Sequence, residues 1–119
     1  MQSVTSTKTS ILSLLPIPSV LAHLEARQLN WPEGTTPRAN LRSDVLIAPV
    51  EILLTDRFLE LWSELRLANS GTQLIVIGDS STPPELLFEV QRELPVFRIY
   101  DSLDEPDLEW GIFEAVERS

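Results

Sequence analysis

The sequence predicts one α/β domain with a doubly wound parallel sheet of five strands and helices on both faces. Short apolar runs of strand length alternate along the chain with longer segments of helical spacing. The stretch Thr72–Ser119 divides into strand, helix, strand and helix with few residues left over. A strand, a crossover helix and a second strand form a parallel unit, and parallel sheets are covered by helices on both faces.

The C-terminal elements have the clearest signals. Thr72–Asp79 is an apolar strand that ends in turn residues, and Pro95–Tyr100 is a second short strand. Between them, Thr82 and Glu85 predict a capping box, with Pro83 at the favoured first helical position. A helix therefore connects these two strands.

The middle of the chain predicts a buried strand followed by an amphipathic helix. Asp44–Val50 is an almost unbroken apolar run, as in strands that are buried on both faces. Asn69–Gly71 predicts a left-handed stop after the helix. The helix itself, Asp56–Ala68, carries apolar residues at helical spacing: Phe58, Leu61, Trp62 and Leu65.

The first third of the chain has weaker signals. Residues Met1–Thr9 are polar and predict a disordered tail, so that the domain spans residues 10–119. Ser10–Leu15 predicts the first strand, and Ser19–Asn30 a helix capped by its serine. The stretch Thr35–Ser43 fits either a short strand or a stunted second helix.

The composition excludes several classes of function. The chain has no cysteine, which excludes disulfides and thiolate chemistry, and its one histidine, His23, argues against a zinc site. A net charge of −9 argues against direct binding to nucleic acid, which needs clustered Lys and Arg. No apolar stretch has membrane-spanning length, and the N-terminus lacks the apolar core of a signal peptide. We expect a soluble, cytoplasmic protein.

The order and spacing of these elements resemble the receiver domain of bacterial response regulators, which has the flavodoxin-like (CheY-like) fold. The similarity is clearest from Asp44 onward. Asp44–Ile47 is similar to the family's third strand, Thr72–Ile77 to its fourth and Pro95–Asp104 to its fifth strand and exit. Glu105–Arg118 is similar to the closing helix.

Receivers carry their chemistry at the strand ends. Two acids after the first strand help to bind Mg²⁺, and an aspartate ending the third strand accepts a phosphoryl group. A Thr or Ser after the fourth strand and a Lys after the fifth respond to it. By resemblance, the acceptor position falls on Pro49, the hydroxyl position on Gly78 and the lysine position on Ser102, and Leu15–Ile17 offers no acid pair.

The resemblance therefore implies a degenerate receiver without phosphorylation, metal, cofactor or enzymatic activity. The only lysine of the chain is Lys8, far from the fifth strand. An alignment shift of one or two residues would bring Glu51 near the acceptor position, where a glutamate could mimic the phosphorylated state. Neither residue replaces the missing chemistry.

A second hypothesis is a small-molecule or nucleotide-binding flavodoxin-like domain, with its ligand at the carboxyl ends of the strands near Pro49 and Gly78–Ser81. The scattered glycines form no phosphate-binding loop. Gly78–Ser81 also resembles the Gly-Asp-Ser nucleophile block of lipolytic hydrolases, but no histidine follows position 23. A simple turn into the next helix is the favoured interpretation of these residues.

The closing helix predicts a buried stripe and an opposite, outward position. Leu108, Ile112 and Val116 form the stripe with Phe113 beside them, and Trp110 lies roughly 160° from its centre. Trp110 is a candidate interface anchor, or it packs against a neighbouring loop or the fifth strand. The acidic residues of this segment form either a solvated helix face or a docking surface for a basic partner.

In receivers, the face made by the fourth helix, fifth strand and fifth helix commonly mediates dimers and partner binding. The resemblance implies a module that binds a protein partner or forms a homodimer through this face. We expect it to be the input domain of a larger bacterial regulator whose output domain follows Ser119. The candidate interface residues are Glu89, Arg92, Arg98, Tyr100 and Trp110.

Overall fold

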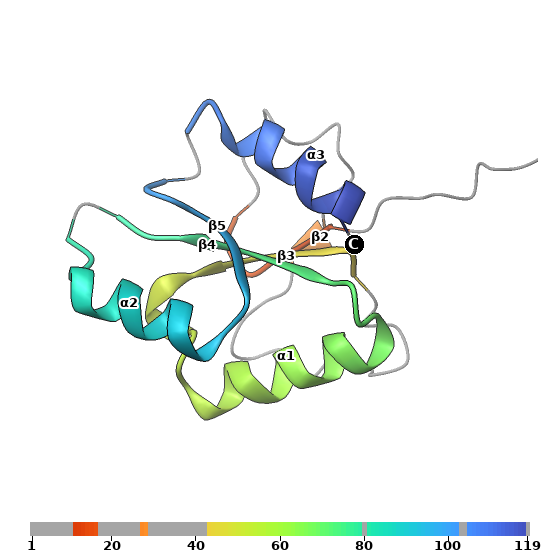
Figure 1. Ribbon diagram of the computed structural model, residues 1–119, viewed down its shortest axis with the longest axis horizontal. Coiled ribbons are helices and arrows are strands. Elements are labelled where there is room, and N and C mark those ends of the chain that lie inside the picture. Colours follow the sequence, from red (N-terminus) through yellow and green to blue (C-terminus); the bar gives the residue numbers. More distant parts are fainter. Residues whose placement is uncertain (1–10, 17–26, 29–42, 80, 103–104, 119) are drawn as a thin grey trace, which may run out of the picture.

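A computed structural model describes residues 11–16, 27–28, 43–79, 81–102 and 105–118 of the chain (Figure 1). These residues form a parallel β-sheet with helices on both faces, so the predicted α/β class is confirmed. Within these ranges, no helix combines the length and the apolarity that crossing a membrane requires.

All strand pairs in the sheet are parallel, and the strand order is β2-β1-β3-β4-β5. The body of the sheet is formed by β1, β3, β4 and β5, while β2 adds a two-residue pairing to β1. Their bounds are Ile11–Ser13 for β1, Arg27–Gln28 for β2, Val45–Pro49 for β3, Gln73–Ile77 for β4 and Val96–Tyr100 for β5.

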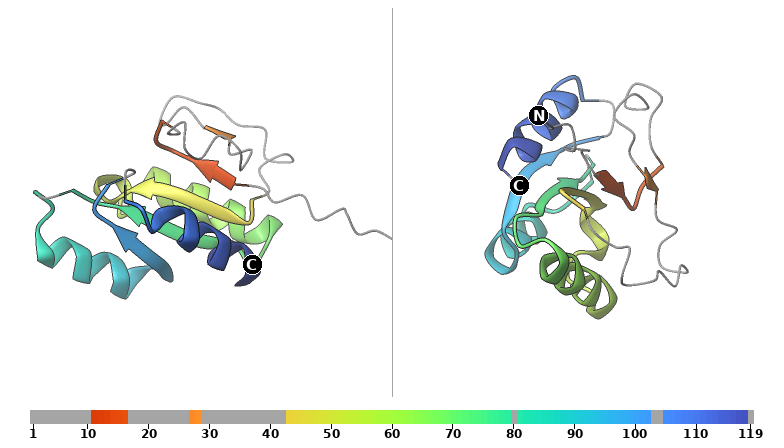
Figure 2. Two further views of the ribbon diagram at one scale, coloured as in Figure 1. Left: turned by 90° about the horizontal axis from the view of Figure 1, so that it is seen from above. Right: turned by 90° about the vertical axis from the view of Figure 1, so that its right-hand side faces the viewer.

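The helices are distributed over the two faces of the sheet (Figures 1 and 2). α1 (Asp56–Ala68) and α2 (Pro84–Glu93) lie on one face, and α3 (Leu108–Arg118) lies on the other. A short 3₁₀ helix, η3 (Val50–Ile52), follows β3.

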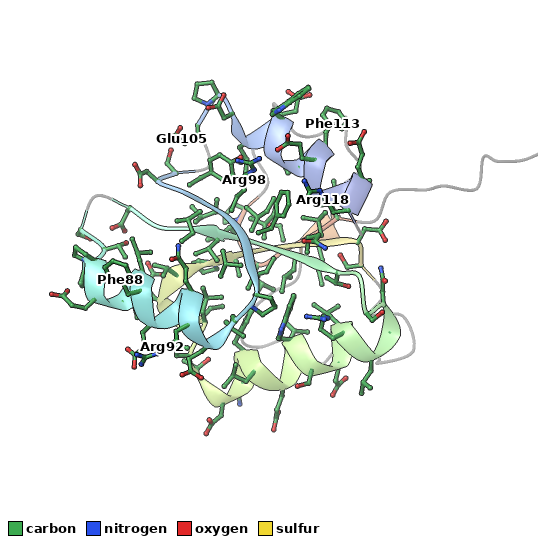
Figure 3. All side chains as sticks on the ribbon, in the orientation of Figure 1. Phe88, Arg92, Arg98, Glu105, Phe113 and Arg118 are labelled. Atoms are coloured by element: carbon green, nitrogen blue, oxygen red, sulfur yellow. The ribbon has the colours of Figure 1, made fainter. Side chains whose placement is uncertain are left out.

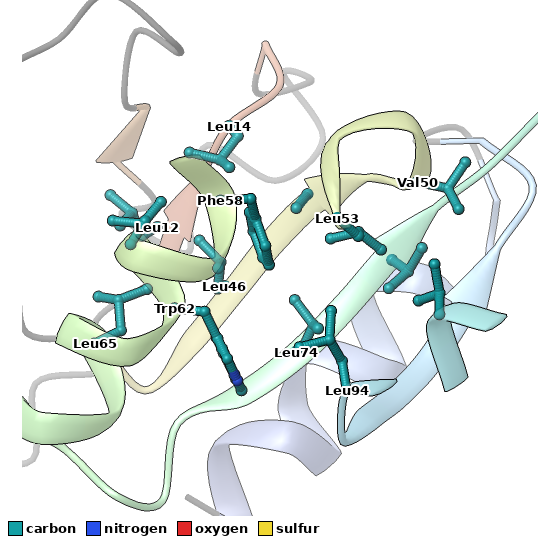
Figure 4. Packing of buried hydrophobic residues seen from close by; sticks show 14 residues of the cluster. Leu12, Leu14, Leu46, Val50, Leu53, Phe58, Trp62, Leu65, Leu74 and Leu94 are labelled. Atoms are coloured by element: carbon teal, nitrogen blue, oxygen red, sulfur yellow. The ribbon is translucent and has the colours of Figure 1, made fainter. Parts of the chain in front are cut away.

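Each face of the sheet has its own apolar core, because alternate residues of a strand point to opposite faces. Leu46 and Ala48 of β3 pack under α1 and α2, whereas Val45 and Ile47 pack under α3. This explains the unbroken apolar run of β3, which is buried on both sides. The first core contains the large side chains of α1 and its surroundings (Figure 4): Phe58, Leu61, Trp62, Leu65, Leu53 and Leu74.

The bounds of α1 are those that the sequence predicts. Thr55 caps its start, since the Thr55 hydroxyl accepts a hydrogen bond from the Phe58 N–H at 3.3 Å. Asn69, the first residue of the predicted left-handed stop, is the C-cap of α1 and is extended, with φ −152°. The Asn69 amide donates to the Ser43 carbonyl oxygen and the Asp44 carboxylate, which ties the end of α1 to the start of β3.

The predicted capping box of α2 is wrong. The helix begins at Pro84 and its N-cap is Pro83, which makes no side-chain capping bond. A residue that precedes a proline is disfavoured in the helical region, so Pro84 holds Pro83 extended, with ψ 138°. Thr82 thus lies one residue too early to cap the helix.

The first third of the chain departs from the predicted helix over Ser19–Asn30, because Arg27–Gln28 forms β2 beside β1. Pairing with β1 overrides the helical preference of these two residues. Residues 19–26, the predicted tail over 1–9 and the predicted strand or helix over 35–42 lie outside the described residues. The closing helix begins at Leu108, three residues later than predicted, after a turn at Pro106 and Asp107.

Candidate functional site

The predicted acceptor, hydroxyl and lysine positions gather at one edge of the sheet. Pro49 at the end of β3 pairs with Ile77, which in turn pairs with Tyr100 of β5. The Gly78 N–H donates to the Tyr100 carbonyl oxygen at 2.7 Å, and Ser102 follows two residues later. The three positions are neighbours because the carboxyl ends of parallel strands meet at the same edge.

The side chains at this edge offer little phosphoryl chemistry. Pro49 has no side-chain oxygen, and Glu51 is exposed on η3. After β1, Leu15 packs into the core below α3 and Pro16 is exposed. In the described part of the chain, no three His, Cys, Asp or Glu side chains are grouped so that they could hold a metal ion.

Asp79 is the first charged residue after β4, and its carboxylate accepts hydrogen bonds from its own turn. One Asp79 oxygen accepts hydrogen bonds from the Ser81 N–H at 2.8 Å and the Ser81 hydroxyl at 2.6 Å. Thr82 also donates to this oxygen, at 3.2 Å. The bonds from Ser81 hold the pKa of Asp79 below its ordinary value, because they stabilise the ionised carboxylate. This geometry favours the turn interpretation of Gly78–Ser81, in which Ser80 lies outside the described residues.

Tyr100 closes the contact between β5 and α3. Its hydroxyl donates to the Asp107 carbonyl oxygen at 3.1 Å, and its ring lies against Gly111. A Cβ atom on Gly111 would lie 2.0 Å from the Tyr100 hydroxyl oxygen, so any other residue here would require Tyr100 to move. Burial is the main reason that the pKa of Tyr100 is raised; Arg98 opposes the shift and Asp107 adds to it.

Tyr100 should therefore titrate above 10.0, the ordinary pKa of a tyrosine. A raised folded-state pKa means that Tyr100 contributes stability that is complete below the unfolded-state pKa and is lost as the pH rises through the folded-state pKa. Tyr100 is the only tyrosine of the chain, so alkaline difference absorption reports on it alone. A midpoint no higher than that of the same protein in denaturant would contradict the prediction.

A β-bulge in β5 places two consecutive side chains on the α3 face. Leu74 pairs with Val96 and Ile75 with Arg98, so Phe97 is an extra residue. Phe97 packs into the core below α3, while the Arg98 guanidinium forms an ion pair with Glu114. The guanidinium carbons of Arg98 and Arg118 lie 5.3 Å and 5.9 Å from the centroid of the Phe97 ring.

The predicted interface residues lie on α2, β5 and α3 (Figures 1 and 3). We call the surface that these three elements form at the β5 end of the sheet the α2–β5–α3 face, although α2 and α3 cover opposite faces of the sheet. Glu89 and Arg92 are exposed on α2, and Trp110 is exposed on α3. Arg98 is exposed but ion-paired, and Tyr100 is half-buried. Exposure leaves Glu89, Arg92 and Trp110 accessible, whereas Tyr100 mainly joins β5 to α3.

Two exposed aromatic residues of this region are not among the predicted interface residues. Phe88 on α2 is 74% exposed and Phe113 on α3 is 45% exposed. The exposure of Phe88 could have been predicted from its angular position on the helix, as was done for Trp110. The buried and half-buried residues of α2 lie on the side of the helix opposite to Phe88. The buried side of α3 includes Gly111 and Ala115 in addition to residues of the predicted stripe. Its centre therefore lies closer to β5 and farther from Phe113 than the sequence predicts.

Comparison of the chain with protein-family models, with curated proteins and with solved structures finds no match. The class that the structure defines is an α/β protein with a parallel sheet.

Proposed function

We propose that this chain is a receiver-like signalling module that is not phosphorylated and acts through protein contacts. In this proposal it is a cytoplasmic, non-enzymatic input domain of a larger bacterial regulator. The strand order β2-β1-β3-β4-β5 supports the proposal, because this order is typical of flavodoxin-like and CheY-like doubly wound sheets. The division of α1, α2 and α3 between the two faces of the sheet is typical of them too.

The observation that carries the proposal is the position of Pro49. It ends β3, the central strand of the order, where a receiver presents its acceptor aspartate. Gly78 and Ser102 stand where a hydroxyl and a lysine would respond to the phosphoryl group. A transferring phosphoryl group needs cations around it, and the described strand ends carry none at these positions.

A domain that is not phosphorylated can transmit a signal by contact with a partner. The α2–β5–α3 face supports this role because it carries two large exposed aromatic side chains, Phe88 and Trp110. Aromatic residues are enriched at protein interfaces and supply much of their binding energy.

Incubation with Mg²⁺ and acetyl phosphate tests the proposal. We expect the intact mass of the protein to stay unchanged, because no aspartate occupies the acceptor position. A phosphorylatable receiver treated in parallel serves as the positive control. A mass increase of one phosphate that hydroxylamine removes would indicate an aspartyl phosphate and would overturn the proposal.

A further inference from the structure

We propose that the outward side of α3 docks an arginine-rich, amphipathic segment of a partner protein, with Trp110 and Phe113 as its apolar anchors. This inference rests on the proposed function, since it assumes that the chain acts through protein contacts. It adds the chemistry of the partner and the place where the partner binds.

Trp110 and Phe113 form an exposed aromatic pair. They are 66% and 45% exposed, and they stand three positions apart on one helix. Residues at this spacing are neighbours on a helix surface, with Cβ atoms about 5–6 Å apart. The opposite side of α3 packs on the sheet through Leu108, Ile112 and Ala115. The aromatic pair therefore faces away from the core.

Acidic residues stand one helical turn before and after Phe113. Glu109 precedes Phe113 by one helical turn, and Glu117 follows it by one turn. Between residues 105 and 118, five acidic residues stand against one arginine, Arg118. One of the five, Glu114, is ion-paired with Arg98, whereas Glu117 is exposed. The side of α3 that presents the aromatic pair is therefore predominantly negative.

Charge complementarity indicates which kind of partner can bind the outward side of α3. A second copy of this chain would bring a net charge of −9 against a surface of the same sign, and nucleic acid or an anionic membrane would do the same. An arginine-rich segment offers the opposite charge, and its guanidinium groups stack on aromatic rings. Apolar residues of the same segment would cover the remaining ring surface.

Contacts between an arginine guanidinium and an aromatic ring also occur within the chain itself. Arg66 lies over the Trp62 ring, with 5.4 Å between the guanidinium carbon and the ring centroid. Arg98 and Arg118 flank the Phe97 ring on the α3 side of the sheet. Trp110 differs from these rings because 66% of its surface is exposed, which leaves it open to a guanidinium from another chain.

The test is the binding of a fluorescently labelled peptide of arginine and leucine residues, arranged at helical spacing, to the full chain. A twin peptide with glutamate in place of every arginine is the charge control. We expect the arginine peptide to bind with an affinity that falls as salt rises, and the glutamate peptide not to bind. Trp110→Ala should weaken the binding by about tenfold or more, and Phe113→Ala should also weaken it.

The choice of variants separates a specific contact from charge attraction. Trp110→Ala leaves the net charge unchanged, so binding by charge alone would survive it. Leu67→Ala removes an apolar side chain that is 87% exposed on α1, on the other face of the sheet, and should leave the affinity unchanged. Thermal melting of each variant verifies that the fold is intact.

Three results would overturn the inference: no binding of the arginine peptide, the same affinity for the Trp110→Ala variant, or a dimer of the free protein that Trp110→Ala dissociates. In the last case the occupant is a second copy. None of these results affects the phosphorylation test, which does not involve Trp110, so the inference can fail while the proposed function stands. Detection of a phosphorylated aspartate would overturn the proposed function, whatever the result of the peptide-binding experiment.

Discussion

Replacing Phe58 with alanine is expected to lower the free energy of unfolding by about 3–5 kcal/mol. The Phe58 side chain is fully buried between α1 and the sheet, where Leu46, Leu53 and Trp62 belong to the same core (Figure 4). Removing the ring loses its transfer free energy and leaves a cavity that a packed core only partly closes. Chemical denaturation monitored by circular dichroism measures the change.

Phe88→Ala is the matched control, because it makes the same chemical change at a side chain that is 74% exposed. It should alter the free energy of unfolding by no more than about 0.5 kcal/mol. Domains of this size are stable by only about 5–15 kcal/mol, so loss of the folded state in Phe58→Ala would also agree with the prediction. Phe58→Leu, which keeps most of the volume, should then be folded. Equal stability of the Phe58→Ala and Phe88→Ala variants would show that this core is wrongly described.

Gly111→Ala is expected to destabilise the protein by about 1–3 kcal/mol, although glycine-to-alanine changes inside a helix usually stabilise it by about 1 kcal/mol. The reversed sign follows from the 2.0 Å that would separate the new Cβ from the Tyr100 hydroxyl oxygen. Tyr100 would have to move, and its hydrogen bond to Asp107 would be lost. Denaturant titration measures the effect.

Two variants verify this interpretation of Gly111→Ala. Ser63→Ala, at an exposed position of α1, isolates the helix-propensity gain and should be neutral or stabilising. In a Tyr100→Leu background, Gly111→Ala should cost clearly less than in the wild-type chain, because the clashing ring is gone. An increase in stability for Gly111→Ala alone would contradict the contact between α3 and β5.

Elements whose local signals agree are predicted correctly from the sequence. α1 matches its predicted bounds because its apolar spacing and its flanking residues indicate the same segment. α2 begins later than predicted because two prolines in sequence compete for the start, and Pro84 constrains Pro83. β2 could not be predicted from Arg27 and Gln28, since their strand conformation depends on pairing with β1.

The candidate site shows the same division between local and long-range effects. Pro49, Gly78 and Ser102 could be placed at one edge because parallel strands fix where their ends meet. The engagement of Asp79 by Ser81 depends on the shape of the turn, which the composition does not specify. The position of Phe97 depends on a bulge that exists only through the register between β4 and β5.

This bulge also bears on aggregation through the edge of the sheet. Among the strands that the structure describes, β5 is the last in the sheet order, so its outer side presents backbone groups that another chain could pair with. Proteins protect such edges with bulges and charged side chains, which interrupt the regular ladder that an incoming strand needs. In the middle of β5, Phe97 is the extra residue of the bulge and Arg98, which follows it, is the charged residue. The irregularity of β5 thereby disfavours the edge-to-edge stacking of sheets that begins β-aggregation.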